Sequence, residues 1–138
     1  CSSKEFASRY HYDGALGAFC GPEGTSFRLW APTAQSVELR LYRTGHGDNA
    51  FFRINLSKES NGVWFWSSPE NLDGVYYDYA VTVQGILQET ADPYARACGL
   101  NGSRSMVIDL ARTNPEGWQK DVPPPKQPED IIYEVHVR

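Results

Sequence analysis

The 138-residue sequence predicts an all-β fold, an antiparallel β-sandwich, and three observations lead to that prediction. Short runs of β-branched and aromatic residues alternate with polar residues at a period of two. Gly, Asn, Asp and Pro separate these runs every 8–12 residues or so, a spacing typical of an immunoglobulin-like sandwich. No stretch repeats apolar residues at the i, i+3, i+4, i+7 positions of an amphipathic helix, so we expect helix only in short turns.

Three of the predicted strands come before the Asn61-Gly62 turn. Thr25–Ala31 combines aromatic and apolar residues and is closed by a proline, which cannot donate to a strand ladder. Val37–Tyr42 and Phe51–Leu56 both place apolar side chains at every second position. One face of each strand is therefore expected to be buried, with the opposite face solvated or covered by something else.

Four further strands are predicted after that turn. The first is short and tryptophan-rich, the second follows an Asp-Gly turn, and the third follows a tight Gln-Gly connection. In the second, five apolar or aromatic residues share one face, which predicts a strand that packs deeply in the core. The four strands are Val63–Trp66, Val75–Val83, Ile86–Glu89 and Met106–Leu110.

The chain divides into four segments. Residues 1–21 form an N-terminal lead-in, and residues 22–112 form the sandwich. Residues 113–130 contain five prolines, which disfavour helix and central strand, so we interpret them as a linker. Residues 131–138 read IIYEVHVR, a strand-like run with no partner after it. We interpret that run as the start of a second, truncated domain.

Charge and composition exclude several kinds of partner. The net charge is −4 and no Lys/Arg cluster is present, which argues against nucleic acid. No apolar run approaches the roughly 20 residues that cross a bilayer, so no membrane partner is expected. The three cysteines are widely spaced and indicate neither a disulfide framework nor a zinc site. The sequence does not indicate a cell compartment.

No motif predicts catalysis in this chain. The three histidines, His11, His46 and His136, are far apart and lack metal-ligand spacing. Carboxylates occur close together as Asp73 with Asp78 and as Glu89 with Asp92. Glycosidases need two carboxyl groups about 5–10 Å apart across a cleft, and these pairs are more simply explained as solvated turn residues. We therefore assign no catalytic residue, no metal site and no cofactor.

Aromatic residues are the strongest signal for binding. The chain has four Trp, eight Tyr and six Phe, and aromatic faces stack on sugar rings or cover interfaces. Alternation places Trp64 and Trp66 on one face, where we expect them in the core. Candidates for contact with a ligand or partner fall on the opposite faces: Trp30, Tyr42, Phe51, Phe65 and Tyr76. Of these, Trp30 and Tyr42 are the candidate carbohydrate contacts.

Several motifs, taken in order, resemble a known family. YDG (12–14), LGA (16–18) and FRLWAPTA (27–34) resemble the opening of the sandwich module of α-amylase-superfamily debranching enzymes, and GVYY (74–77) and DPYA (92–95) continue it. NGSRS (101–105), VIDL (107–110) and TNPEGW (113–118) narrow the resemblance to type I pullulanases. IYEVHVR (132–138) resembles the first strand of their catalytic barrel.

The resemblance implies a family 48 carbohydrate-binding module followed by a (β/α)₈ barrel. Such a barrel hydrolyses α-1,6 linkages in pullulan, glycogen and starch with retention, and its catalytic carboxylates lie on later strands. The implied partners are the barrel of the same parent chain and an α-glucan. Glycogen-binding members carry tryptophans where this chain has Leu87 or Gln88 and, roughly, Tyr42. Binding of α-glucan by this module is therefore expected to be weak, if it occurs.

Three functions are compatible with these observations. The chain could support the barrel and substrate placement of a pullulanase-type enzyme, with no activity of its own. It could be an independent glycogen- or starch-binding module. It could also be an immunoglobulin-like interaction domain. A sandwich fold does not separate the three, because fold does not determine function.

Overall fold

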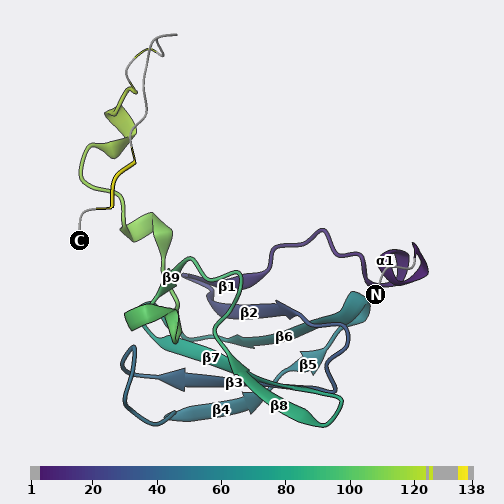
Figure 1. Ribbon diagram of the computed structural model, residues 1–138. Coiled ribbons are helices and arrows are strands. Elements are labelled where there is room, and N and C mark those ends of the chain that lie inside the picture. The colour runs from purple at the N-terminus through teal and green to yellow at the C-terminus, as the bar shows by residue number, and fades with distance from the viewer. Residues whose placement is uncertain (1–3, 124, 126–133, 137–138) are drawn as a thin grey trace.

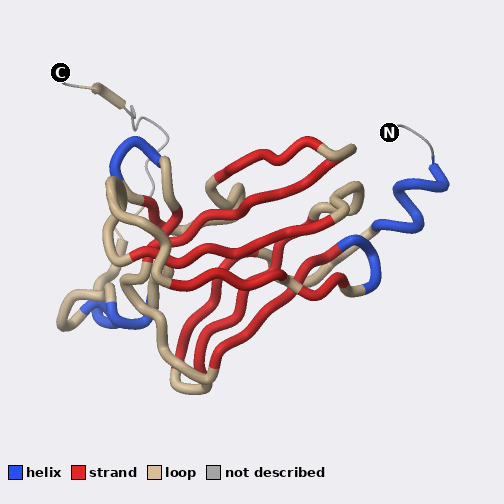
Figure 2. The backbone as a smooth tube through the Cα atoms, turned by 90° about the horizontal axis from the view of Figure 1, so that it is seen from below, coloured by secondary structure: helices blue, strands red, loops and turns tan. Residues whose placement is uncertain are grey.

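The computed structural model describes residues 4–123, 125 and 134–136. Over these residues the chain forms two antiparallel sheets that pack face to face (Figure 1). Helical segments lie at the periphery of the strands (Figure 2). The predicted all-β sandwich is therefore confirmed.

The two sheets have different sizes. The smaller has the order β1-β2-β6-β5, with strands Gly17–Gly21, Gly24–Trp30, Val63–Ser68 and Ser57–Lys58. The larger has the order β4-β3-β7-β10-β9, with strands Phe52–Asn55, Ser36–Tyr42, Tyr76–Val83, Ser105–Met106 and Ala97–Cys98. Strand β8, Ile86–Thr90, pairs with β7 outside that order.

The core lies between the sheets and follows the period-two pattern of the sequence. Each sheet contributes alternate residues, among them Phe27 and Trp64 from the small sheet and Leu39 and Tyr77 from the large one. The rings of Phe27 and Tyr77 meet edge to face across the sandwich, with centroids 5.1 Å apart. Fully burying a side chain of this kind stabilises the fold by about 1.5–3 kcal/mol. Trp64 is buried and Trp66 packs against the core, as predicted.

The turn before β6 requires glycine at Gly62. Asn61 and Gly62 both adopt positive φ, 60° and 76°. A Cβ on Gly62 would lie 2.5 Å from the Cα of Pro32, so no other residue fits without a shift of backbone. This close approach brings the end of β2 and the start of β6 together, which positions Trp30 for the site described below.

Several elements differ from the sequence prediction. Lys4–Tyr10 forms α1, although no helix was expected beyond short turns. At seven residues α1 is too short to show sustained helical periodicity. Strand β1 lies within the predicted lead-in of residues 1–21, so the small sheet begins there. The last predicted strand, Met106–Leu110, overlaps the two-residue β10 only at Met106, and its last residue belongs to η3 (Leu110–Arg112).

Short 3-10 turns complete the described chain: η1 (Ser60–Gly62), η2 (Leu100–Gly102) and η4 (Trp118–Lys120). Beyond η3 the chain leaves the sandwich (Figure 1). The strand predicted at 131–138 lies outside the described residues, apart from 134–136, which are exposed.

Three chemical features of the described part bear on function. No helix in it is long and apolar enough to cross a bilayer. No group of three or more His, Cys, Asp or Glu side chains there could hold a metal ion. Cys20 and Cys98 are both free thiols.

Candidate functional site

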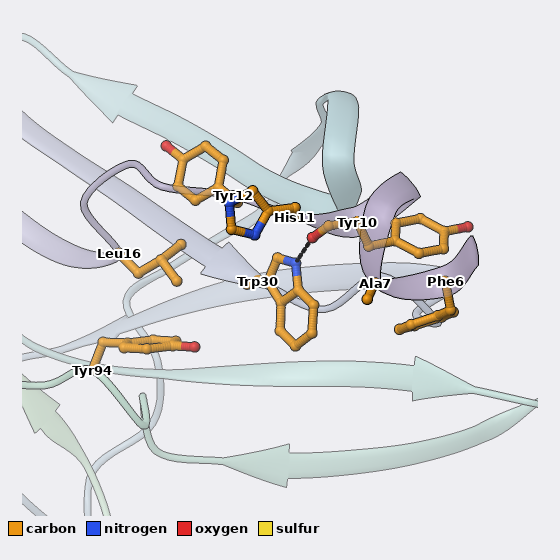
Figure 3. A pocket seen from close by; sticks show the side chains of 8 residues that line it. All are labelled: Phe6, Ala7, Tyr10, His11, Tyr12, Leu16, Trp30 and Tyr94. Carbon is orange, nitrogen blue, oxygen red and sulfur yellow. Dashed lines mark hydrogen bonds between the residues drawn. The ribbon is translucent and has the colours of Figure 1, made fainter. Parts of the chain in front are cut away.

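An aromatic groove of about 460 Å³ lies between α1, the end of β2 and the loop after β8. Trp30 stands at its centre, with aromatic and apolar neighbours on both sides (Figure 3). The lining residues are Phe6, Ala7, Tyr10, His11, Tyr12, Leu16, Trp30 and Tyr94. We call this the Trp30 groove.

The indole of Trp30 is held in place by two backbone carbonyls. Its Nε1–H donates to the carbonyl oxygen of Tyr10 at 3.0 Å and to that of Asn61 at 3.1 Å. These acceptors come from the end of α1 and from the turn before β6. Together with β2, which carries Trp30, they fix the ring from three segments. The side chain is nevertheless 36% exposed. A ring that is both oriented and exposed is suited to stacking.

The flanks of the groove combine apolar surface with polar groups. Leu16 and Tyr94 lie on one side of the indole, and Phe6 and Tyr10 lie on the other (Figure 3). The ring centroids of Phe6 and Tyr10 are 4.7 Å apart, so these two side chains of α1 pack against each other.

The rim of the groove carries hydrogen-bonding groups. The His11 Nε2 lies 2.8 Å from an Asp13 carboxylate oxygen, and both side chains are exposed. Tyr12 packs over Gly14, where a Cβ would lie 2.3 Å from the Tyr12 hydroxyl oxygen. A side chain at Gly14 would therefore require the Tyr12 ring to move. The groove therefore offers apolar ring faces beside hydroxyl and imidazole groups.

Tyr42, the second predicted carbohydrate contact, is only 5% exposed. Alternation places it on the outer face of the large sheet as predicted, but other groups cover it there. Its hydroxyl donates to the Asp78 carboxylate at 3.0 Å. The guanidinium of Arg104 lies 3.5 Å from its ring centroid. Tyr42 therefore presents little free surface to a ligand.

The carboxylate pairs noted in the sequence have separate partners. Asp92 is buried and accepts hydrogen bonds from the Tyr77 hydroxyl and the Tyr94 backbone N–H, both at 2.8 Å. Its burial raises its pKa above the ordinary value. Glu89 is exposed and pairs with Arg40, whose hydrogen bond and charge lower the pKa of Glu89.

Asp73 and Asp78 also lie in different settings. Asp73 accepts from Arg112 and from the backbone N–H of Asp109, both at 2.9 Å. Asp78 is buried under Tyr42, and burial raises its pKa. Each of these carboxylates thus has a structural partner of its own.

The other aromatic candidates vary in accessibility. Phe51 is 47% exposed, with Arg43 over its ring. Phe65 is half-buried beneath the guanidinium of Arg28. Tyr76 is half-buried and lies against Gly45 and Gly99.

Sequence reasoning identified Trp30 but missed the residues around it. Phe6 and Tyr10 are four positions apart, which places them on one side of a helix and is the signal that could have found them. Tyr94 sits in the DPYA motif, where the turn is held by Asp92. Alternation gives no information about such a loop residue.

Comparison with known proteins adds the following. Residues 10–95 match the family model of Carbohydrate-binding module 48 (Isoamylase N-terminal domain). Pullulanase 1, chloroplastic, of Arabidopsis thaliana is 40% identical over 94% of this chain, which covers 14% of that protein. Pullulanase of Bacillus subtilis (strain 168) is 31% identical over 96% of this chain and 18% of its own length.

A solved structure agrees with the sequence matches. Pullulanase from Paenibacillus barengoltzii, in complex with maltohexaose and α-cyclodextrin, superposes with a TM-score of 0.85 at 40% identity. The match covers 91% of this chain and 20% of that one. The chain thus spans a fifth or less of the length of these relatives.

Proposed function

Because the chain belongs to the carbohydrate-binding module 48 family, we propose that it is the N-terminal module of a pullulanase-type debranching enzyme. The parent would be a glycoside hydrolase that acts on the α-1,6 linkages of pullulan, glycogen or starch. The observation that carries the proposal is the match to pullulanases over more than nine-tenths of the chain, in sequence and in fold.

In this proposal the chemistry lies in the rest of the parent. Residues 113–130 connect the sandwich to a catalytic barrel, and residues 131–138 supply its first strand. The far greater length of the relatives supports this division. The described residues supply partners for the sandwich carboxylates rather than a catalytic pair, so the module alone is expected to be inactive.

Hydrolysis of pullulan tests the proposal. The full-length parent should release reducing sugar from pullulan but not from linear α-1,4-glucan. The isolated 138-residue chain should release none. An inactive parent, or turnover by the isolated chain that is abolished by changing one of its own carboxylates, would contradict the proposal.

The module's own contribution is α-glucan contact at the Trp30 groove. A pyranose ring has an apolar face and a rim of hydroxyl groups, and the groove offers a fixed, exposed indole beside polar side chains. Stacking on one ring contributes on the order of 1 kcal/mol, so the affinity should be millimolar at best. The groove would then guide substrate rather than bind it tightly.

Titration with maltoheptaose tests this contact. Trp30→Ala should remove the part of the sugar-induced change in tryptophan fluorescence that comes from Trp30. Trp30→Phe, followed by nuclear magnetic resonance, should retain part of the binding at the groove because it keeps a ring. Trp118→Ala is the matched control, since that tryptophan is exposed and lies away from the groove. Low-micromolar affinity, or binding unaffected by Trp30→Ala, would refute the assignment.

The second candidate is an independent glycogen- or starch-binding module. The family description favours it over an immunoglobulin-like interaction domain. The covered ring of Tyr42 disfavours tight binding at the outer face of the large sheet. Strong retardation of the isolated chain in amylopectin gels would support this second function.

A further inference from the structure

A second aromatic cleft, separate from the Trp30 groove, opens at the edge of the sandwich between β4 and β6. Its volume is about 260 Å³. It is lined by Leu41, Phe51, Phe52, Trp66, Ser68, Glu70 and Leu72. None of these residues lines the Trp30 groove. We call it the Phe52 cleft.

The cleft exists because the small sheet is incomplete beside β6. Strand β5 has two residues and pairs only with Trp64 and Phe65. The following half of β6, residues 66–68, therefore has no strand neighbour on that side among the described residues. Phe52 pairs with the buried Leu41 and shares its core-facing side, yet it is 39% exposed. A core-facing aromatic is thus left uncovered at the mouth of the sandwich.

The aromatic surface of the cleft is firmly held. The rings of Phe52 and Trp66 have centroids 5.5 Å apart. Trp66 in turn packs against the buried Phe27, at 5.8 Å. Phe51 forms a wall of the cleft, with Arg43 stacked against its ring at 5.0 Å. Because Phe52 packs on Trp66 and Trp66 packs on the core, a ligand would not have to order these two rings on binding.

The polar groups of the cleft are free to bind. The carboxylate of Glu70 makes no hydrogen bond or ion pair among the described residues, although it lines an apolar cleft. The Ser68 Oγ accepts from the Glu70 backbone N–H at 3.1 Å, which leaves its own proton available to donate. The cleft therefore presents an anionic acceptor and a hydroxyl donor beside aromatic rings.

We propose that the Phe52 cleft is a second α-glucan contact, which takes one pyranose ring. The ring would pack on Phe52 and Trp66, and its hydroxyl groups would donate to Glu70 and accept from Ser68. The cleft is smaller than the roughly 300–1,000 Å³ of sites for drug-sized ligands, so it suits a single sugar ring better than a larger ligand. A neutral ligand rich in hydroxyl donors also suits the free carboxylate, whereas an anionic one does not. The proposal rests on the proposed α-glucan function of the module.

Nuclear magnetic resonance of the whole chain tests the proposal, with maltoheptaose as the probe. In the wild type we expect saturable shifts of the Trp66 indole N–H and the Phe52 amide, in addition to the Trp30 indole. In Trp30→Ala the shifts at the cleft should persist. Combining Glu70→Gln with Trp30→Ala should lower the affinity measured from the cleft shifts about fivefold, because a charged acceptor is lost. Glu59→Gln, another exposed carboxylate outside both sites, is the matched control.

The outcomes separate the two sites. Shifts confined to Trp30 would overturn the cleft proposal while leaving α-glucan contact by the module intact. Shifts at the cleft alone would support the cleft proposal and contradict the assignment of Trp30 as an α-glucan contact. Shifts at neither site would overturn both assignments. Equal effects of Glu70→Gln and Glu59→Gln would overturn the cleft proposal. So would shifts of the cleft residues when the protein is diluted without sugar, because a second copy of the chain would then cover the cleft.

Discussion

At the scale of single residues, Asp92 links its own loop to two strands of the large sheet. It accepts from Tyr77 on β7 and from the backbone of Tyr94, while its own backbone N–H donates to the Ser105 Oγ on β10 at 2.8 Å. The same loop carries Tyr94 into the Trp30 groove. A buried polar residue thus shapes a surface site.

The pKa of Asp92 predicts a pH effect on stability. Burial raises this pKa, so between the ordinary value of 3.8 and the raised value the folded state keeps a proton that the unfolded state has released. The contribution of Asp92 to the free energy of unfolding should therefore fall as pH rises through that window. Urea unfolding of Asp92→Asn and of the wild type at pH 4 and pH 7 tests this. The free energy of unfolding of the variant, relative to that of the wild type, should be higher at pH 7 than at pH 4. A difference that does not change with pH would contradict this.

Asp92→Ala should behave differently from Asp92→Asn. It leaves the buried Tyr77 hydroxyl and the Tyr94 N–H without their acceptor, which should cost about 1–3 kcal/mol at either pH. Unfolding in urea measures this cost. If Asp92→Ala is as stable as the wild type, the hydrogen bonds of Asp92 do not hold the loop.

Arg104 covers Tyr42, because its guanidinium lies over the ring. A guanidinium over an aromatic ring contributes about 0.5–2 kcal/mol, and Arg104 also donates to the Thr44 carbonyl at 2.8 Å. Arg104→Ala should lower the Tm and expose Tyr42 to nitration by tetranitromethane. Mass spectrometry of tryptic peptides measures the nitration of Tyr42, with Arg53→Ala as an exposed control. Equal nitration in the wild type and in Arg104→Ala would show that Arg104 is not the cover.

At the scale of elements, α1 meets the sandwich at the Trp30 indole and at η1, the turn before β6. No residue of α1 is buried, and its last residue, Tyr10, accepts the hydrogen bond from the Trp30 indole. The helix therefore contributes more to the shape of the groove than to the core.

Deleting residues 1–10 should separate these two contributions. We expect the free energy of unfolding to fall by less than about 1 kcal/mol, because α1 contributes no buried side chain. Trp30 should become more exposed, which red-shifts its fluorescence, and maltoheptaose binding should weaken. A large loss of stability would show that α1 belongs to the core, and unchanged binding would show that α1 is not part of the site.

The sequence predicted the regular strands well because burial on one face imposes alternation. Tyr77 and Tyr79 on β7 are fully buried, as their phase indicates. Shorter pieces such as β5 and β9 are held by neighbouring strands rather than by a pattern of their own, so two residues carry no periodic signal. The alternation along β3 also placed Tyr42 correctly on the outer face of the large sheet. It could not predict that Tyr42 is buried, because Arg104 reaches it from a loop distant in the sequence.

At the scale of the whole molecule, the two aromatic sites lie on different parts of the sandwich. The Trp30 groove depends on α1 and the loop after β8, and the Phe52 cleft depends on the shortness of β5. We propose one weak sugar contact at each. Two weak contacts on one rigid body can still raise the local concentration of a polymeric substrate near a joined catalytic domain.

We propose that this module guides α-glucan to a debranching barrel through Trp30. The most direct test is the pullulan kinetics of the full-length parent carrying Trp30→Ala. We predict a KM about fivefold higher with an unchanged kcat, because a remote stacking contact worth about 1 kcal/mol is lost. Trp30→Phe should show a smaller rise. A KM unchanged by Trp30→Ala, or a parent without activity on pullulan, would contradict the account.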